Sequence, residues 1–231
     1  FGSEWGTDKV GNGIAYAYIR FKYNRDVFSG VPTVIFEIEG RKIRDVDNLS
    51  NPVAFSRNPA NCIYDYLTHP IYGRNFPASE LDLTSFQDAK DYYDVAHTYL
   101  NAGDHYSTAR NIFNGFVDTS QNTYENTKAM MTTCNSALTY TGGKYHLIPF
   151  KARNSEHSIT DSEIIGDITL RLGDKTELFN TVRVSFADED EEYQNSSAII
   201  RDSTYYSDDN DLELKSEVTL DIATNRDRAQ L

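Results

Sequence analysis

The sequence is poor in cysteine, in long apolar runs and in basic residues, and each shortage excludes a class of protein. Two cysteines, Cys62 and Cys134, are too few for the disulfide framework of a small secreted domain. Both stand beside apolar neighbours in helical patterns, so we predict buried, reduced thiols and a cytoplasmic origin. No apolar run approaches the about 20 residues of a membrane span, and no signal-peptide core is visible. With 22 Lys and Arg against 35 Asp and Glu, the net charge of −13 disfavours nonspecific binding to nucleic acid and anionic membranes.

Tyrosine, by contrast, is abundant, with 16 Tyr against a single Trp. A tyrosine has an apolar body and a polar tip, so this abundance indicates half-buried strands and surfaces presented to partners. The 231 residues suffice for one large domain or two modest ones, each with its own core. Because the sequence begins at Phe1 without Met and stops at Leu231, we expect a piece of a longer protein.

The first 50 residues read as β structure. Residues 14–23 are apolar and rich in strand-forming side chains, and a turn-rich stretch follows them. A second strand is predicted over residues 33–39; it is interrupted at Gly40 and resumes over residues 42–44.

After residue 50 the sequence pattern indicates helices. Asn58 and Pro59 predict a helix start, because the Asn side chain can cap the helix and the proline ring presets the first helical φ. Pro70 stops this helix. A second helix is predicted from Thr84, with Gln87 completing a capping box.

A strand, a helix and a hairpin are predicted to close the middle block. Residues 109–118 read as the strand, and Asp118 or Thr119 can cap the helix after it. The hairpin covers residues 137–150, where Gly142 and Gly143 supply the positive φ of a two-residue turn. The predicted inner face of the helix consists of Thr127, Met131, Cys134 and Leu138.

From residue 154 the pattern returns to β. Residues 167–172 and 180–186 alternate between apolar and polar side chains, and further strands are predicted near 197–201 and 213–221. Thr224 has the position of a cap for a helix that the sequence cuts short. We therefore predict an α+β, strand-dominated protein in three parts: a β segment (1–50), an α/β domain (51–150) and a β-barrel-like domain (151–231).

The chemistry-bearing residues do not suggest an enzyme. The five histidines have no metal-ligand spacing, so we expect no zinc site and no cofactor. The acidic run of residues 188–192 reads as a solvated loop, since consecutive carboxylates diverge and repel. A calcium site built with Asp208, Asp209 and Asp211 stays open as an alternative, although the glycine of a calcium-binding loop is missing. The histidines are His69, His97, His105, His146 and His157.

Five stretches, in order, resemble the central tail-tip proteins of lambda-like bacteriophages, which have long non-contractile tails. They are "GIAYAYIRFKYNRDVFSGVPTVIFEIEGRKIRD", "SRNPANCIYDYLTHPIYGRN", "FNGFVDTSQNTYENTKAMMTTCNSALTYTGGKYHLIPF", "NTVRVSFADEDEEYQ" and "IIRDSTYYSDDNDLELKSEVTLDIATNRDRAQ". The resemblance covers nearly the whole chain. Residues 99–107 and the acidic turns depart from the family pattern.

The resemblance implies a structural role in the virion. Such proteins form a homotrimeric hub, related to the baseplate hub of contractile tails, that caps the tail tube and leads to the receptor-binding fibre. The partners implied are two further copies, a tail tube or distal tail protein and the tape measure protein, with assembly in the host cytoplasm and no membrane binding. On this reading the hairpin at Gly142 and Gly143 holds shape, and the acidic balance lets genome DNA pass without sticking. Two other classes stay open: a tail-associated cell-wall hydrolase and a carbohydrate-binding surface module.

Overall fold

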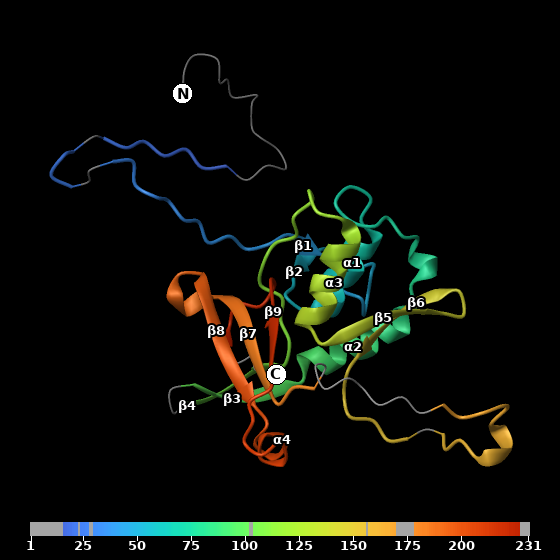
Figure 1. Cartoon of the computed structure of the whole chain (residues 1–231). Helices are drawn as coiled ribbons and strands as arrows, with labels where there is room; N and C mark the ends of the chain where they lie inside the picture. The colour runs from blue at the N-terminus through green and yellow to red at the C-terminus, as the bar shows by residue number, and fades with distance from the viewer. Residues whose placement is uncertain are drawn as a thin grey trace. The chain divides into compact units, whose positions relative to one another are not determined.

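The computed structural model describes residues 16–22, 24–27, 30–101, 104–155, 157–169 and 178–226. It divides the chain into two units, residues 1–39 and 40–231, and each unit is described by itself. Helices and strands both build the second unit, so the predicted α+β class is confirmed (Figure 1). The division at residues 50 and 150 stays a prediction.

The described strands form three two-stranded sheets, β1-β2, β3-β4 and β5-β6, and one three-stranded sheet of order β8-β7-β9. In chain order the elements are β1 (Lys42–Ile43), β2 (Ala54–Phe55), α1 (Pro59–Thr68), η1 (Ala78–Glu80), α2 (Leu83–Asp94), β3 (Ala96–Asn101), β4 (Asp104–Ala109), α3 (Thr123–Thr133), β5 (Ser136–Thr141), β6 (Lys144–Pro149), η2 (Asp161–Glu163), β7 (Thr181–Asp188), η4 (Glu189–Glu191), β8 (Gln194–Arg201), α4 (Ser203–Asp208) and β9 (Lys215–Thr219).

Helix α1 begins where the sequence predicts. The side chain of Asn58 accepts a 2.9 Å hydrogen bond from the Ala60 N–H, and Pro59 is the first helical residue. The helix ends at Thr68, two residues before Pro70.

The predicted start of α2 differs by one residue, and the predicted cap of α3 by three or four residues. Helix α2 is capped by Asp82, whose carboxylate accepts from the Ser85 N–H at 2.9 Å. Gln87 makes no capping box there, because its side-chain amide donates to the Val46 carbonyl. Helix α3 is capped by Asn122. The carboxylate of Asp118 accepts from the Ser120 N–H in a turn before the helix.

The β5–β6 hairpin is confirmed, and its geometry explains the glycines. Thr141 pairs with Lys144, so Gly142 and Gly143 form a two-residue loop. Their φ angles are +58° and +83°, as a turn matching the strand twist requires. Leu138, predicted on the inner face of the preceding helix, lies on β5 instead.

The predicted strand over residues 109–118 is wrong except for its first residue. Strands β3 and β4 pair with each other as an antiparallel hairpin that ends at Ala109. In the loop that follows, Phe113 donates its N–H to the Arg57 carbonyl and Asn114 donates to the Ile222 carbonyl. Because these backbone partners come from two separate connecting segments, no ladder forms.

The C-terminal sheet contains the three predicted strands, β7, β8 and β9, and a helix that was not predicted. Strand β7 pairs antiparallel with β8 and parallel with β9. A parallel neighbour needs a crossover connection, and the unpredicted helix α4, capped by Asp202, lies in it. The predicted strand over residues 167–172 is irregular over 167–169, and its other residues lie outside the described part.

The two strands predicted before residue 40 do not form within the described residues. Residues 16–22 and 33–39 are not part of any strand, while Ile14 and Tyr23 lie outside the described part. The predicted strand at residues 42–44 reduces to β1, which pairs with β2. A strand needs a partner for its backbone groups, and the alternating pattern alone does not supply one.

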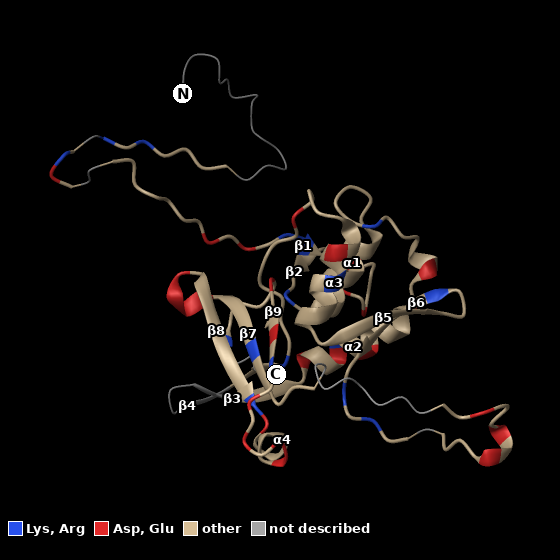
Figure 2. Cartoon of the chain, in the orientation of Figure 1, with Lys and Arg blue, Asp and Glu red and all other residues tan. Residues whose placement is uncertain are grey.

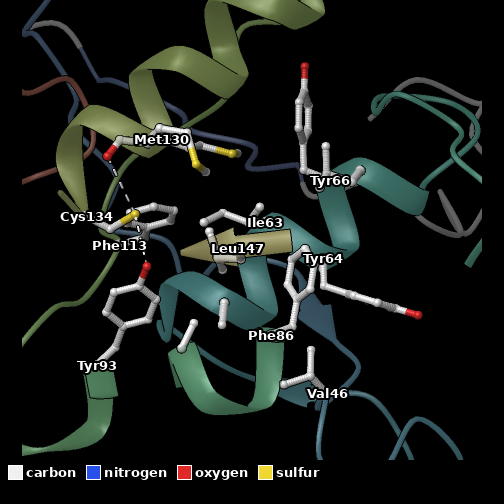
Figure 3. Packing of buried hydrophobic residues seen from close by; sticks show 14 of the residues in the cluster. Val46, Ile63, Tyr64, Tyr66, Phe86, Tyr93, Phe113, Met130, Cys134 and Leu147 are labelled. Atoms are coloured by element: carbon white, nitrogen blue, oxygen red, sulfur yellow. Dashed lines mark hydrogen bonds between the residues drawn. The ribbon is translucent and has the colours of Figure 1, made fainter. Parts of the chain in front are cut away.

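The main core lies among α1, α2, α3 and the β5–β6 hairpin. Figure 3 shows Ile63, Phe86 and Leu147 within it, with the Tyr93 hydroxyl directed at Cys134. Ile63 and Phe86 are fully buried, and each such side chain contributes about 1.5–3 kcal/mol through burial. Val46 and Ile222 join this core from opposite ends of the second unit. A smaller core beneath the C-terminal sheet contains Val184, Phe186, Ala198, Leu220 and Ala223.

Candidate functional site

A polar cluster, half-buried except for the buried Thr224, joins the loop after β4 to the turn after β7 and to the segment after β9. We call its four side chains, Asn114, Glu189, Thr224 and Asn225, the polar junction. The Asn114 amide donates to the Glu189 carboxylate at 3.0 Å and to the Thr224 hydroxyl at 2.8 Å. The Thr224 hydroxyl donates to the same carboxylate at 3.0 Å, and Asn225 approaches its other oxygen at 3.4 Å. One carboxylate therefore gathers three side chains from two distant segments.

Backbone contacts reinforce the polar junction. The N–H of Glu189 donates to the Thr224 carbonyl, and the N–H of Asn114 donates to the Ile222 carbonyl, both at 2.9 Å. At Gly115 a Cβ atom would lie 3.2 Å from the Asp221 carbonyl oxygen, so the two segments approach closely. These side-chain and backbone hydrogen bonds hold the three segments together.

The acidic run at residues 188–192, coloured red in Figure 2, is only in part the solvated loop that the sequence predicts. Asp188 is 7% exposed, and its carboxylate accepts from the Asp190 N–H to cap η4. Glu189 belongs to the polar junction, while Asp190, Glu191 and Glu192 are exposed. Asp188 ends β7 on the buried face of that strand, and the one-turn helix η4 then directs Glu189 toward the protein and Asp190 and Glu191 away from it. Sequence reasoning missed the junction, because no local pattern links Asn114 to Glu189.

A second polar cluster lines a cleft of about 440 Å³ between β1, β2 and α2. Lys90 forms ion pairs with Asp45, at 2.8 Å, and with Asp47. Nearby, the Asn58 amide donates to the Asp94 carboxylate at 2.8 Å and to the Lys90 carbonyl at 3.1 Å. Asn58 thus caps α1 with its oxygen and holds α2 with its nitrogen.

The ionisation of this cleft does not favour acid–base chemistry. Burial alone would raise the pKa of Asp45, but the hydrogen bonds from Lys90 and Asp47 lower it below its usual value. Burial alone would lower the pKa of Lys90, and its hydrogen bonds to Asp45 and Asp47 raise it instead. Both groups therefore stay charged near neutral pH, and neither is poised to exchange a proton.

The residues named for metal binding are not brought together. Among the described side chains, no group of three or more His, Cys, Asp or Glu is placed to hold a metal ion. The Asp209 carboxylate accepts from the Asn180 amide at 2.8 Å, while Asp211 sits in a left-handed backbone conformation after α4. The calcium alternative at Asp208, Asp209 and Asp211 stays an untested prediction.

The histidines are spread over separate elements. His69 stacks on Tyr72, and His157 lies 2.9 Å from Glu163. His146 lies 3.7 Å from Asp82, and His97 and His105 are on the paired strands β3 and β4.

The two cysteines are free thiols. Burial is the main cause that raises the pKa of Cys62 to about 12, and burial also raises the pKa of Cys134. Both groups are therefore poor nucleophiles, because the thiolate is the reactive form.

No helix among the described residues is long and apolar enough to cross a membrane.

Comparison with known proteins gives two matches. A family model described as a putative phage tail protein matches residues 122–231. The chain is also 24% identical to the baseplate hub protein pb3 of Escherichia phage T5, in an alignment of length 227 that covers 91% of this chain. That stretch is 24% of the relative, so the chain spans about a quarter of its length. These likenesses support a structural role in a phage tail.

Proposed function

We propose that the chain is a structural component of the tail tip of a long, non-contractile phage tail, one of three copies in a hub that closes the tail tube. The observation that carries the proposal is the likeness to a baseplate hub protein over 91% of the chain. That likeness extends beyond residues 122–231, the part of the chain that the family model matches.

The proposed partners follow from the position of a hub. Two further copies surround it, a tail tube or distal tail protein lies on one side, and the tape measure protein ends there. On the other side, parts of the full-length protein lead to the receptor-binding fibre. The hub is assembled in the host cytoplasm, and it acts in host attachment and DNA ejection through shape alone.

The polar junction suits a part that must keep its shape under load. A cluster of satisfied hydrogen bonds between distant segments resists their separation, because opening it leaves a carboxylate and an amide without partners. In the proposed hub, the junction keeps the C-terminal sheet fixed to the loop after β4 while neighbouring subunits pull on each.

The charge balance supports passage of DNA without binding. The net charge is −13, and a surface of that sign releases no counterions from the phosphate backbone. Asp190, Glu191 and Glu192 are exposed and available for this repulsion, whereas Asp188 and Glu189 are turned to the protein.

The position in the virion tests the proposal. Phage carrying an epitope tag on this protein are labelled with antibody-coated gold and imaged by electron microscopy. Label at the tail tip is the expected result, and label on the capsid or none on intact virions contradicts it. Release of muropeptides by the purified protein would instead establish a cell-wall hydrolase, and monomeric binding to a glycan array would establish a surface module.

A further inference from the structure

Residues 33–39 have the pattern of a two-faced strand but no strand partner among the described residues. We call them the amphipathic segment. Val34, Phe36 and Ile38 alternate with Thr33, Ile35, Glu37 and Glu39. The apolar row is exposed, from 41% at Val34 to 71% at Ile38. An exposed apolar row, on a backbone with no strand partner in the described part of the chain, favours the addition of this segment to a sheet.

Strand β8 offers an edge for such an addition. It pairs with β7 on one side, and no described strand lies on its other side (Figure 1). Its inner row, with Ala198 and Ile200, faces the smaller core. Its outer row contains Ile199 and Arg201, and Ile199 is 60% exposed.

One register matches the two strands on both faces. If the amphipathic segment lies parallel to β8 with Ile35 beside Ile199, Glu37 falls beside Arg201. On the inner face, Val34 and Phe36 then extend the row of Ala198 and Ile200. A shift by one residue would turn Glu37 toward the smaller core, so the pattern specifies the face. Arg201 already binds Glu213 at 2.6 Å, and a guanidinium has further donors for a second carboxylate.

We propose that the amphipathic segment of one copy adds a parallel strand to the β8 edge of a neighbouring copy. This rests on the proposed function in taking the neighbour to be a second copy of the chain. Each copy then gives one strand and receives one, a head-to-tail contact that closes into a ring. Main-chain hydrogen bonds supply the attachment, and the apolar row and the Glu37–Arg201 pair supply the register.

Cross-linking between separately substituted chains tests the proposal. The Ile35→Cys and Ile199→Cys variants of the full chain are mixed and treated with a short bismaleimide, and denatured chains are sized. The native thiols react slowly, since burial raises the pKa of Cys62 to about 12 and also raises that of Cys134. We expect several-fold more linked dimer in the mixture than in either variant alone. Phe36→Cys replaces Ile35→Cys as the control, because residue 36 faces the opposite side of the sheet.

Two outcomes overturn the inference. The first is no excess of linked dimer over the Phe36→Cys control. The second is a link confined to one chain when Ile35→Cys and Ile199→Cys are combined, which would place the segment on its own β8. A further variant, Glu37→Lys, lowers the yield of linked dimer several-fold by repulsion from Arg201. Its control is Glu39→Lys, which makes the same charge change two residues further along the segment. If gold labels the tail tip but the chains do not cross-link, this inference alone is wrong. If gold does not label intact virions, the proposed function is wrong.

Discussion

The side-chain amide of Asn114 donates a 3.0 Å hydrogen bond to the carboxylate of Glu189, 75 residues further along the chain. Thr224 donates to the same oxygen, so segments from three places in the sequence share one acceptor. While the contact is intact, its net effect on the free energy of folding is small. Loss of one member lowers the stability more, because the remaining groups stay partly desolvated and have lost their partners.

Replacing Glu189 by Ala therefore lowers the free energy of unfolding by about 1–3 kcal/mol. Glu189→Gln recovers part of the loss, since an amide oxygen still accepts from Asn114. The matched control is Glu191→Ala, an exposed residue of the same short helix, which we expect to stay within about 0.5 kcal/mol of the wild type. Urea unfolding followed by circular dichroism measures all three. Equal losses at residues 189 and 191 would show that the junction is not a stabilising contact.

Asn58 and Asn122 both cap helices, but their surroundings differ. Asn58 is 7% exposed and also donates to Asp94, whereas Asn122 is exposed. Loss of an N-cap costs about 1 kcal/mol in either case. We expect Asn58→Ala to cost more than Asn122→Ala, because it also removes the donor to Asp94 and to the Lys90 carbonyl. Denaturant midpoints of the two variants decide this, and an equal cost would limit the role of Asn58 to capping.

Gly73 and Gly142 are needed for different reasons, and alanine substitutions at the two positions distinguish these reasons. At Gly73 a Cβ atom would lie 1.8 Å from the Tyr66 carbonyl oxygen, so the backbone must move. At Gly142 nothing lies within 4 Å, and the cost is that of a φ of +58°, about 1–2 kcal/mol. We expect Gly73→Ala to lower the thermal midpoint more than Gly142→Ala, while Gly142→Asn stays near the wild type because Asn tolerates this conformation. A larger effect at Gly142 would contradict the steric explanation.

Elements with a strong local cause are the ones that the sequence predicts. The Asn58-Pro59 start needs no information from elsewhere in the chain, and neither does the turn at Gly142 and Gly143. Strand β7 was predictable because its alternation continues through Phe186. In each case the chemistry that decides the conformation lies within a few residues.

The remaining features depend on partners far away in the sequence. Asp82 is the cap of α2, and its backbone N–H donates to the carbonyl of Tyr145, which is far away in the sequence. The loop at residues 110–118 stays irregular because Arg57 and Ile222 take its hydrogen bonds. Asn114 has no local feature that marks it for the polar junction. For residues 33–39 the pattern indicates a strand, but a strand forms where a partner exists, and the described part of one chain lacks it.

The ion pairs of Lys90 give stability a defined pH dependence. The pKa of Asp45 is lowered in the folded protein, so its contribution is present above the unfolded value of about 3.9 and is lost as pH falls through the folded pKa. The pKa of Lys90 is raised, so its contribution is complete below about 10.4 and is lost as pH rises through the folded pKa. We expect Lys90→Met to cost about 1 kcal/mol at neutral pH, a modest figure because the Asp45 side chain is 43% exposed.

The size of that cost should vary with pH in a way that identifies its cause. Between about pH 5 and pH 9 the difference between Lys90→Met and the wild type should be flat, and it should shrink below about pH 4 as Asp45 takes up a proton. Lys128→Met, at an exposed position on α3, is the control and should show no such change. Urea unfolding at a series of pH values supplies the measurement. A difference that persists unchanged to pH 3 would mean that the packing of the Lys90 side chain, and not its charge, stabilises the cleft, because the aliphatic stem of a lysine also buries apolar surface.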